Sequence, residues 1–188
     1  MAQEGRVFVV AGPSGAGKGT LIRRALENAR NLYYSVSVTT RLPGAGEVEG
    51  KDYHFISDEQ FDALVRQDAF LEWEEVHGRR YGTLESEVEK ARVAGKDVLL
   101  ELDVKGALNV RSKLEDALLV FVMPPSLEEL EARLRKRDRE GEEDISARMR
   151  EAEREIETGR ADFDVVIAND DVDEAAAQLL RVIREEPA

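Results

Sequence analysis

A glycine-rich turn between an apolar run and a helical pattern constrains the fold of this chain more than any other feature. The apolar run Val7–Ala11 is typical of a buried strand of a parallel sheet. After the turn, the spacing of Leu21, Ile22 and Ala25 predicts a helix with one apolar face. The backbone N–H groups of a turn in this position, at the positive end of a helix dipole, bind phosphate groups. The pattern predicts a nucleoside triphosphate site made of Gly12, Pro13, Ser14, Gly15, Ala16, Gly17, Lys18, Gly19 and Thr20.

The turn completes the pattern G-x-x-x-x-G-K at Lys18, whose compact positive charge suits the outer phosphates. The hydroxyl residue that usually follows the lysine is displaced, because Gly19 comes first and Thr20 second. A glycine-rich connection with a solvated lysine is the alternative interpretation. The strand before the turn and the helix after it disfavour that alternative.

Composition excludes several kinds of site. The chain of 188 residues has no cysteine, which excludes disulfides, thiolate zinc sites and thiol nucleophiles. Its two histidines, His54 and His77, are too few for a histidine metal site. The net charge of −13 argues against nucleic-acid binding, and the longest apolar run, Ala117–Met123, is too short to span a bilayer. We expect a soluble cytoplasmic protein that concentrates positive charge locally wherever it binds phosphate.

Helical patterns separate four apolar runs, and this alternation predicts an α/β fold with a parallel sheet and helices on both faces. The runs are Val7–Ala11, Val98–Leu102, Leu118–Met123 and Val165–Ala168. Two regions interrupt the alternation. Residues 35–83 contain an alternating segment at Ser35–Thr39 and a helical pattern at Asp58–Arg66, which together predict a small β-rich insertion. Residues 126–157 are dense in charges of both signs, which leaves a solvated helical hairpin and a moving lid as alternatives.

Further motifs follow the glycine-rich turn in the order and spacing of guanylate kinases, a family of P-loop nucleoside monophosphate kinases. These motifs are Ser35–Arg41, Gly46–Tyr53, Phe70–Trp73, Tyr81–Thr83, Leu102–Asp103 before Gly106, Pro124–Ser126 and Val166–Asp170. The sequence resembles this family over nearly its whole length. The resemblance implies a P-loop NTPase fold, transfer of the γ-phosphoryl group of ATP to GMP, and Mg²⁺ bound with ATP. It also implies core segments at 1–34, 84–125 and 158–188, a GMP-binding insertion at 35–83 and a helical lid at 126–157.

The resemblance assigns GMP binding to Ser37, Arg41, Tyr53, Glu72, Tyr81, Thr83 and Asp103. Chemistry supports these residue types. Guanine presents N1–H and an exocyclic amine along one edge, and a carboxylate such as Glu72 accepts hydrogen bonds from both. Arg41 offers the GMP phosphate a forked donor, and Tyr53 and Tyr81 offer single O–H donors. The alternatives are an ordinary surface glutamate at position 72 and core aromatics at positions 53 and 81.

The resemblance also assigns catalytic roles to Lys18 and to three lid arginines, Arg133, Arg137 and Arg148. Arg133 and Arg137 are four residues apart and share a helix face. Phosphoryl transfer depends mainly on positioning, on magnesium and on arginine charge, which explains why the chain needs no nucleophile and no histidine base.

Two departures from the family pattern affect the expected site. Gly44 stands where the family commonly has a second phosphate-binding arginine. Glu101 stands where aspartate is usual, and we expect it to contact Mg²⁺ through water. Adenylate kinase and a catalytically inactive scaffold domain are the rival functions. The sequence leaves open whether dGMP is also a substrate and whether the protein is a monomer or a homodimer.

Overall fold

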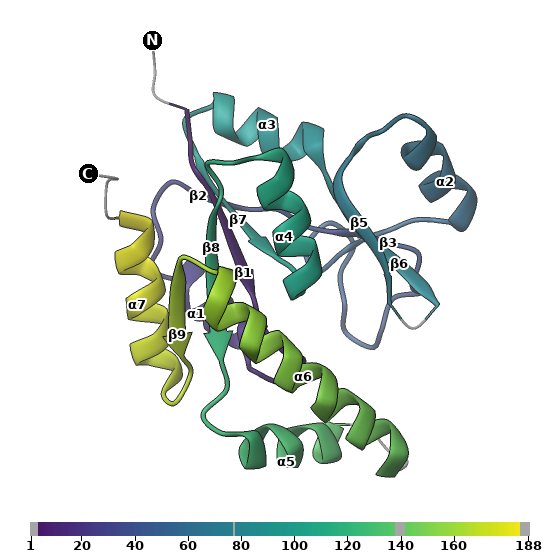
Figure 1. The fold of residues 1–188 in the computed structure, drawn as a ribbon. Coiled ribbons are helices and arrows are strands. Elements are labelled where there is room, and N and C mark those ends of the chain that lie inside the picture. Colours follow the sequence, from purple (N-terminus) through teal and green to yellow (C-terminus); the bar gives the residue numbers. More distant parts are fainter. Residues whose placement is uncertain (1–3, 77, 138–141, 185–188) are drawn as a thin grey trace.

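A five-stranded parallel sheet forms the centre of the protein. The computed structural model describes residues 4–76, 78–137 and 142–184, and Figure 1 shows their arrangement. The strand order is β2-β7-β1-β8-β9, and every neighbouring pair is parallel. The strands are β1 (Val7–Ala11), β2 (Leu32–Tyr34), β7 (Asp97–Glu101), β8 (Leu118–Met123) and β9 (Val165–Ala168). The predicted α/β fold is confirmed, and the four predicted strands are present, with β7 beginning one residue earlier than expected.

Helices cover both faces of this sheet. Alternate residues of β1 point to opposite faces, so Phe8 and Val10 pack on one side while Val7 and Val9 pack on the other. The first face is covered by α1 (Lys18–Leu26) and α7 (Val172–Arg184), and the second by α3 (Glu85–Val93) and α4 (Val104–Lys113). The two apolar layers leave the carboxyl edge of the sheet open to ligands.

A second, four-stranded sheet lies beside the first (Figure 1), in the order β4-β3-β6-β5. Its core is built on Phe61 and Phe70, whose stacked rings lie 4.5 Å apart. The helix predicted at Asp58–Arg66 is α2, and Ser57 and Gln60 form a capping box at its start. The strands are β3 (Val38–Thr39), β4 (His54–Phe55), β5 (Phe70–Val76) and β6 (Arg79–Leu84).

The alternating segment at Ser35–Thr39 forms a shorter strand than its pattern predicts. Only Val38 and Thr39 pair within the small sheet. The N–H of Ser35 donates instead to the carbonyl of Leu99 in the central sheet, at 3.0 Å. The segment therefore crosses from one sheet to the other, which an alternating pattern alone does not reveal.

Two helices, α5 (Leu127–Arg137) and α6 (Glu142–Asp162), follow strand β8; α5 lies at one end of the molecule, and α6 runs from there back to the central sheet (Figure 1). Ser126 begins α5 by accepting a hydrogen bond from the N–H of Glu129 at 3.1 Å, which caps the first turn of the helix. Leu130 and Leu134 pack against Ala152 of α6. Within the described ranges, no helix is long and apolar enough to cross a membrane.

Gly159 lets α6 pass close to the central sheet, and replacing it tests that contact. A Cβ atom on Gly159 would lie 2.2 Å from Cδ2 of Phe121, which is fully buried in β8. We expect Gly159→Ala to lower the free energy of unfolding by roughly 1–3 kcal/mol, because the buried ring must move. Alanine is the better helix former by about 1 kcal/mol, which opposes the effect. Urea unfolding measures the difference.

Two controls accompany this variant. Glu157→Ala changes an exposed position of the same helix and should leave the free energy of unfolding nearly unaltered. In a Phe121→Leu background, which provides space, Gly159→Ala should cost less than in the natural protein. A stabilised Gly159→Ala protein would contradict the close contact between α6 and Phe121.

Candidate active site

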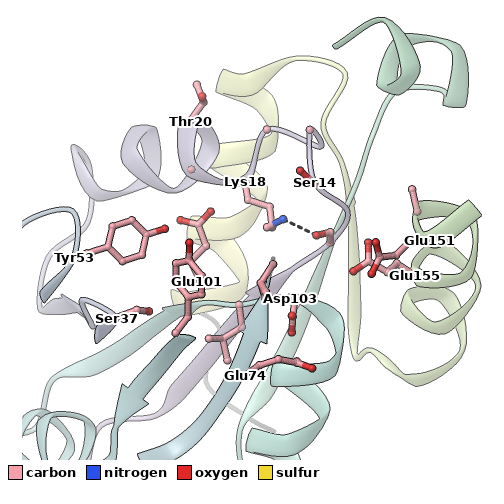
Figure 2. A pocket seen from close by; sticks show the side chains of 18 of the residues that line it. Ser14, Lys18, Thr20, Ser37, Tyr53, Glu74, Glu101, Asp103, Glu151 and Glu155 are labelled. Carbon is pink, nitrogen blue, oxygen red and sulfur yellow. Dashed lines mark hydrogen bonds between the residues drawn. The ribbon is translucent and has the colours of Figure 1, made fainter. Parts of the chain in front are cut away.

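A cavity of about 730 Å³ lies where the glycine-rich turn, the small sheet and α6 meet. Its wall includes Gly12, Ser14, Gly15, Gly17, Lys18, Gly19 and Thr20 of the turn. Across the cavity it includes Ser37, Tyr53, Glu72 and Tyr81 of the small sheet. Figure 2 looks into this space and shows Lys18 facing it from the start of α1, and Glu101 and Asp103 facing it from the end of the central sheet. Most residues predicted for the two substrates therefore line one cavity, although Arg41 and Thr83 are not among its lining residues.

The glycines of the turn are required by close packing. Gly17 has φ +88°, and a Cβ atom there would lie 2.5 Å from Nδ2 of Asn169. A Cβ atom on Gly12, with φ +149°, would lie 2.4 Å from the carbonyl oxygen of Val122. Asn169 is buried and donates a hydrogen bond from Nδ2 to the carbonyl of Ala16 at 2.7 Å. The amide thereby attaches the turn to the end of β9, a role that was not predicted for Asn169 from the sequence.

Basic side chains surround the turn. Lys18 donates from Nζ to the carbonyls of Gly12 and Pro13, the latter at 3.2 Å. Arg148 of α6 donates to Oγ of Ser14 at 3.1 Å. Arg133 of α5 donates to the carbonyl of Gly15 at 3.3 Å and also pairs with Glu129.

Two of the three predicted lid arginines therefore contact the turn directly. The third, Arg137, is the last residue of α5, and its side chain lies outside the described part of the chain.

Glu72 and Thr83 form a buried pair within the small sheet. They lie opposite each other on β5 and β6, and Oγ1 of Thr83 donates to Oε1 of Glu72 at 2.8 Å. Glu72 is 8% exposed, so the alternative of an ordinary surface glutamate is wrong. Burial raises the pKa of Glu72 to about 7, the charges of Asp103 and Glu74 add to the rise, and the Thr83 hydrogen bond opposes it.

The predicted phosphate donors of GMP also lie together. The rings of Tyr53 and Tyr81 meet edge to face at 5.9 Å, and the Arg41 guanidinium lies 5.2 Å from the centre of the Tyr53 ring. Both tyrosines line the cavity, which disfavours the alternative of core aromatics. Burial is the largest cause that raises the pKa of Tyr53.

The partner of Arg41 was not predicted from the sequence. Glu47 accepts both prongs of the guanidinium fork, at 2.7 and 2.9 Å, and also the N–H of Gly44 at 2.6 Å. The Glu47 hydrogen bond is the largest cause that raises the pKa of Arg41. A side chain at position 44 would crowd this carboxylate, because a Cβ atom on Gly44 would lie 3.1 Å from Oε2 of Glu47. The φ angle of Gly44 lies outside the left-handed region, so crowding there is a matter of space alone.

The two acidic residues at the end of β7 have different surroundings. Glu101 accepts a hydrogen bond from the hydroxyl of Tyr34 at 3.2 Å. Its two carboxylate oxygens would lie 3.6 and 3.7 Å from a Cβ atom on Gly19. Asp103 lines the cavity and begins α4 by accepting a hydrogen bond from the N–H of Gly106 at 2.6 Å. The longer side chain of Glu101 therefore lies beside the position where the turn lacks its hydroxyl.

Helix α6 adds two carboxylates that were not predicted for the site. Glu151 and Glu155 face the cavity from α6, as Figure 2 shows. The pKa of Glu155 is raised to about 7, mainly by burial; the charge of Lys18 opposes the rise, and the charges of Glu151 and Asp103 contribute to it. They belong to a charge-rich segment, and such a composition predicts side chains that face solvent. The sequence therefore gives no signal that these two carboxylates face a cavity.

Comparison with known proteins identifies the family. The guanylate kinase family model matches residues 4–186. The chain belongs to the guanylate kinase family. A guanylate kinase of Thermus thermophilus is 47% identical over 182 residues, which cover 97% of this chain and 82% of that relative. The guanylate kinase of Rubrobacter xylanophilus is 45% identical, covering 97% of this chain and 95% of that relative.

A solved structure agrees with this assignment. The crystal structure of guanylate kinase from Anaplasma phagocytophilum has a TM-score of 0.79 and 34% identity, covering 97% of this chain and 86% of that one. The predicted family is confirmed, and the match disfavours adenylate kinase. Guanylate kinases are ATP:GMP phosphotransferases, the activity that the motifs predict. The relatives it matches are named guanylate kinases, which disfavours the catalytically inactive scaffold domain.

The buried carboxyl of Glu72 predicts a pH-dependent stability in the ligand-free protein. Its pKa of about 7 exceeds the ordinary value of 4.5, so the folded state binds the proton more tightly than the unfolded state. The stability contributed by Glu72 therefore falls as the pH rises from 4.5 through 7. We expect Glu72→Gln to raise the free energy of unfolding at pH 8 by on the order of 2 kcal/mol more than at pH 5.

Urea unfolding of both proteins at each pH measures this difference. Comparing variant with natural protein at the same pH cancels the titration of Glu155, which occurs in the same range. Glu75→Gln changes the exposed neighbour and serves as the control. Equal effects of Glu72→Gln at the two pH values would contradict the raised pKa.

Proposed function

We propose that this member of the guanylate kinase family transfers the γ-phosphoryl group of ATP to GMP, giving ADP and GDP, within the described cavity. The observation that carries the proposal is the buried carboxylate of Glu72, which faces the same cavity as the phosphate-binding turn. The turn suits a triphosphate, and a carboxylate paired with a threonine hydroxyl suits the guanine edge. Family membership supports the same pair of substrates.

In this proposal ATP binds the turn at residues 12–20, and Lys18 contacts its outer phosphates. Lys18 donates to loop carbonyls in the ligand-free protein, so binding requires its Nζ to exchange those acceptors for phosphate oxygens. Arg133 and Arg148 supply further positive charge at the transferring group, because both already reach the turn. Such charge stabilises the transition state of phosphoryl transfer. Arg137 is proposed for the same role from the family pattern.

GMP binds the small sheet. Glu72 accepts from the guanine edge, while Thr83 and Ser37 contribute hydroxyls to the base. Arg41, Tyr53 and Tyr81 hold the phosphate, and Asp103 contacts the nucleotide from the central sheet. The protein itself holds this cluster together, since its two rings and the guanidinium lie side by side. Side chains that are already held in place lose less conformational entropy when the ligand binds.

We propose the segment division that the family pattern implies, with the insertion at 35–83 and the lid at 126–157. Helices α5 and α6 pack on each other through Leu130, Leu134 and Ala152. Leu130 also lies close to the turn, because a Cβ atom on Gly15 would be 3.0 Å from its Cδ1. A lid so attached can exclude water when both substrates are bound. We further propose a cytoplasmic protein whose ligands are ATP and GMP, as a monomer or a homodimer.

Mg²⁺ is the proposed cofactor, and Glu101 is the residue proposed to hold it, through water. No group of three or more acidic, histidine or cysteine residues suited to a metal occurs among the described residues. This fits Mg²⁺, which proteins often bind with one or two carboxylates plus the substrate phosphates. Bound Mg²⁺ would neutralise charge that develops on the phosphate oxygens. Glu101 lies beside Gly19, so its longer side chain can compensate for the hydroxyl that the turn lacks at position 19.

The proposed function is tested by a coupled assay with ATP and each nucleoside monophosphate in turn. We expect turnover with GMP and little with AMP. Glu72→Ala should raise KM for GMP by about 100-fold or more and leave KM for ATP nearly unchanged, because the guanine donors lose a buried acceptor. Glu89→Ala, at an exposed position of α3 that does not line the cavity, is the control. Equal use of AMP and GMP by the natural protein would overturn the assignment.

The magnesium role of Glu101 is tested by binding rather than by turnover. Fluorescence titration with a fluorescent ATP analogue measures the Kd with and without Mg²⁺. We expect Glu101→Ala to reduce the affinity for the metal by about 10- to 100-fold, while metal-free nucleotide binding persists. Glu151→Ala removes another carboxylate of the same cavity and serves as the control.

A paired substitution tests whether Glu101 compensates for Gly19. Glu101→Asp should weaken the Mg²⁺ effect, and adding Gly19→Ser should restore it, since a hydroxyl returns to the turn as the carboxylate shortens. An undiminished Mg²⁺ effect in Glu101→Ala would show that the metal is held elsewhere.

A further inference from the structure

Glu74 is a carboxylate of the cavity wall that the proposed function does not use. It lies on β5 two residues after Glu72, so the two side chains share a face of the strand. The two charges interact, because Glu74 contributes to the raised pKa of Glu72. Figure 2 shows Glu74 below Asp103 in this view of the cavity.

The carboxylate of Glu74 is only half satisfied. Its Oε1 pairs with Nζ of Lys105, a side chain that is 72% exposed. Its Oε2 is buried and has no hydrogen-bond partner among the described residues. A buried acceptor without a donor costs free energy, and such atoms are uncommon in folded proteins. A donor supplied by a ligand would remove this cost.

Strand pairing places Glu74 on the phosphate side of Glu72, along the path from the proposed base site to the proposed phosphate site. Glu72 lies opposite Thr83, at the proposed base site, and Glu74 lies opposite Tyr81, at the proposed phosphate site. In a nucleoside monophosphate the ribose joins the base to the phosphate. The sugar therefore passes Glu74, and its hydroxyl groups are hydrogen-bond donors.

We propose that Glu74 accepts a hydrogen bond from a ribose hydroxyl and thereby favours GMP over its deoxy analogues. The inference rests on the GMP site proposed above. Oε2 is buried, so the carboxylate turns about its terminal bond when the nucleotide binds. That torsion is soft in glutamate, and Oε1 can stay near the flexible Lys105 amine during the turn.

The hydrogen bond makes Glu74 a specificity-determining residue. A site that pairs with a substrate hydroxyl rejects an analogue without it, because the acceptor is left unpaired. The partial solvent access of Glu74 and its pairing with Lys105 moderate the effect. We expect about a 10-fold preference in kcat/KM for GMP over the analogue that lacks the recognised hydroxyl.

The experiment compares GMP, 2′-deoxy-GMP and 3′-deoxy-GMP as substrates of the natural protein and of Glu74→Ala. We expect the variant to lose about 10-fold in kcat/KM for GMP while one deoxy analogue is nearly unaffected, which identifies the hydroxyl. That analogue is the internal control for folding and catalysis. Glu89→Ala removes an equal charge from an exposed position of α3 that does not line the cavity, and it should leave the substrate preference unchanged.

The outcomes separate this inference from the proposed function. If Glu74→Ala changes GMP and both analogues by one factor, or changes none of them, Glu74 does not read the ribose. When Glu72→Ala still raises KM for GMP in the same assay, only the Glu74 inference fails. If Glu72→Ala also has no effect, the proposed GMP site itself is wrong.

Discussion

The packing of the glycine-rich turn against the carboxyl ends of neighbouring strands is the constraint on which the site depends. A side chain at Gly12 would collide with β8, and one at Gly17 would collide with Asn169. Glycine at both positions therefore allows the backbone of the turn to pack directly against the sheet. The Asn169 amide then holds the turn through the carbonyl of Ala16. Because the strands are parallel, their carboxyl ends meet at one edge, and Glu101 reaches the same space from β7.

Local pairing explains how a chain with a net charge of −13 can bind two polyanionic substrates. The cavity is lined by several carboxylates, and arginines are held beside it by acidic partners, as Arg41 is by Glu47. An arginine that is fixed before binding loses less freedom when phosphate arrives. Burial raises the pKa of Glu72 and of Glu155 to about 7, so before nucleotide binds each carries less negative charge near neutral pH than an exposed glutamate would. Electrostatic suitability for anions is thus a property of the site rather than of the whole surface.

Several features of the fold were predictable because their signals are local. Buried parallel strands read as apolar runs, and α2 has both a capping box and an apolar face. Helix α4 and strand β2 were not predicted. The strand is only three residues long, and the helix contains three residues of low helix propensity, Gly106, Asn109 and Ser112. Packing against the central sheet stabilises both, which overrides weak local propensity.

The sequence by itself determined the family, the phosphate-binding turn and the residue types expected at each substrate, because these depend on motifs in fixed order. Only the tertiary structure decided which side chains share an environment. It buried Glu72, brought Glu47 onto Arg41 and turned Glu155 of α6 toward Lys18. It also left one oxygen of Glu74 without a partner among the described residues. Burial and pairing arise between segments distant in the chain, so no local pattern of residues encodes them.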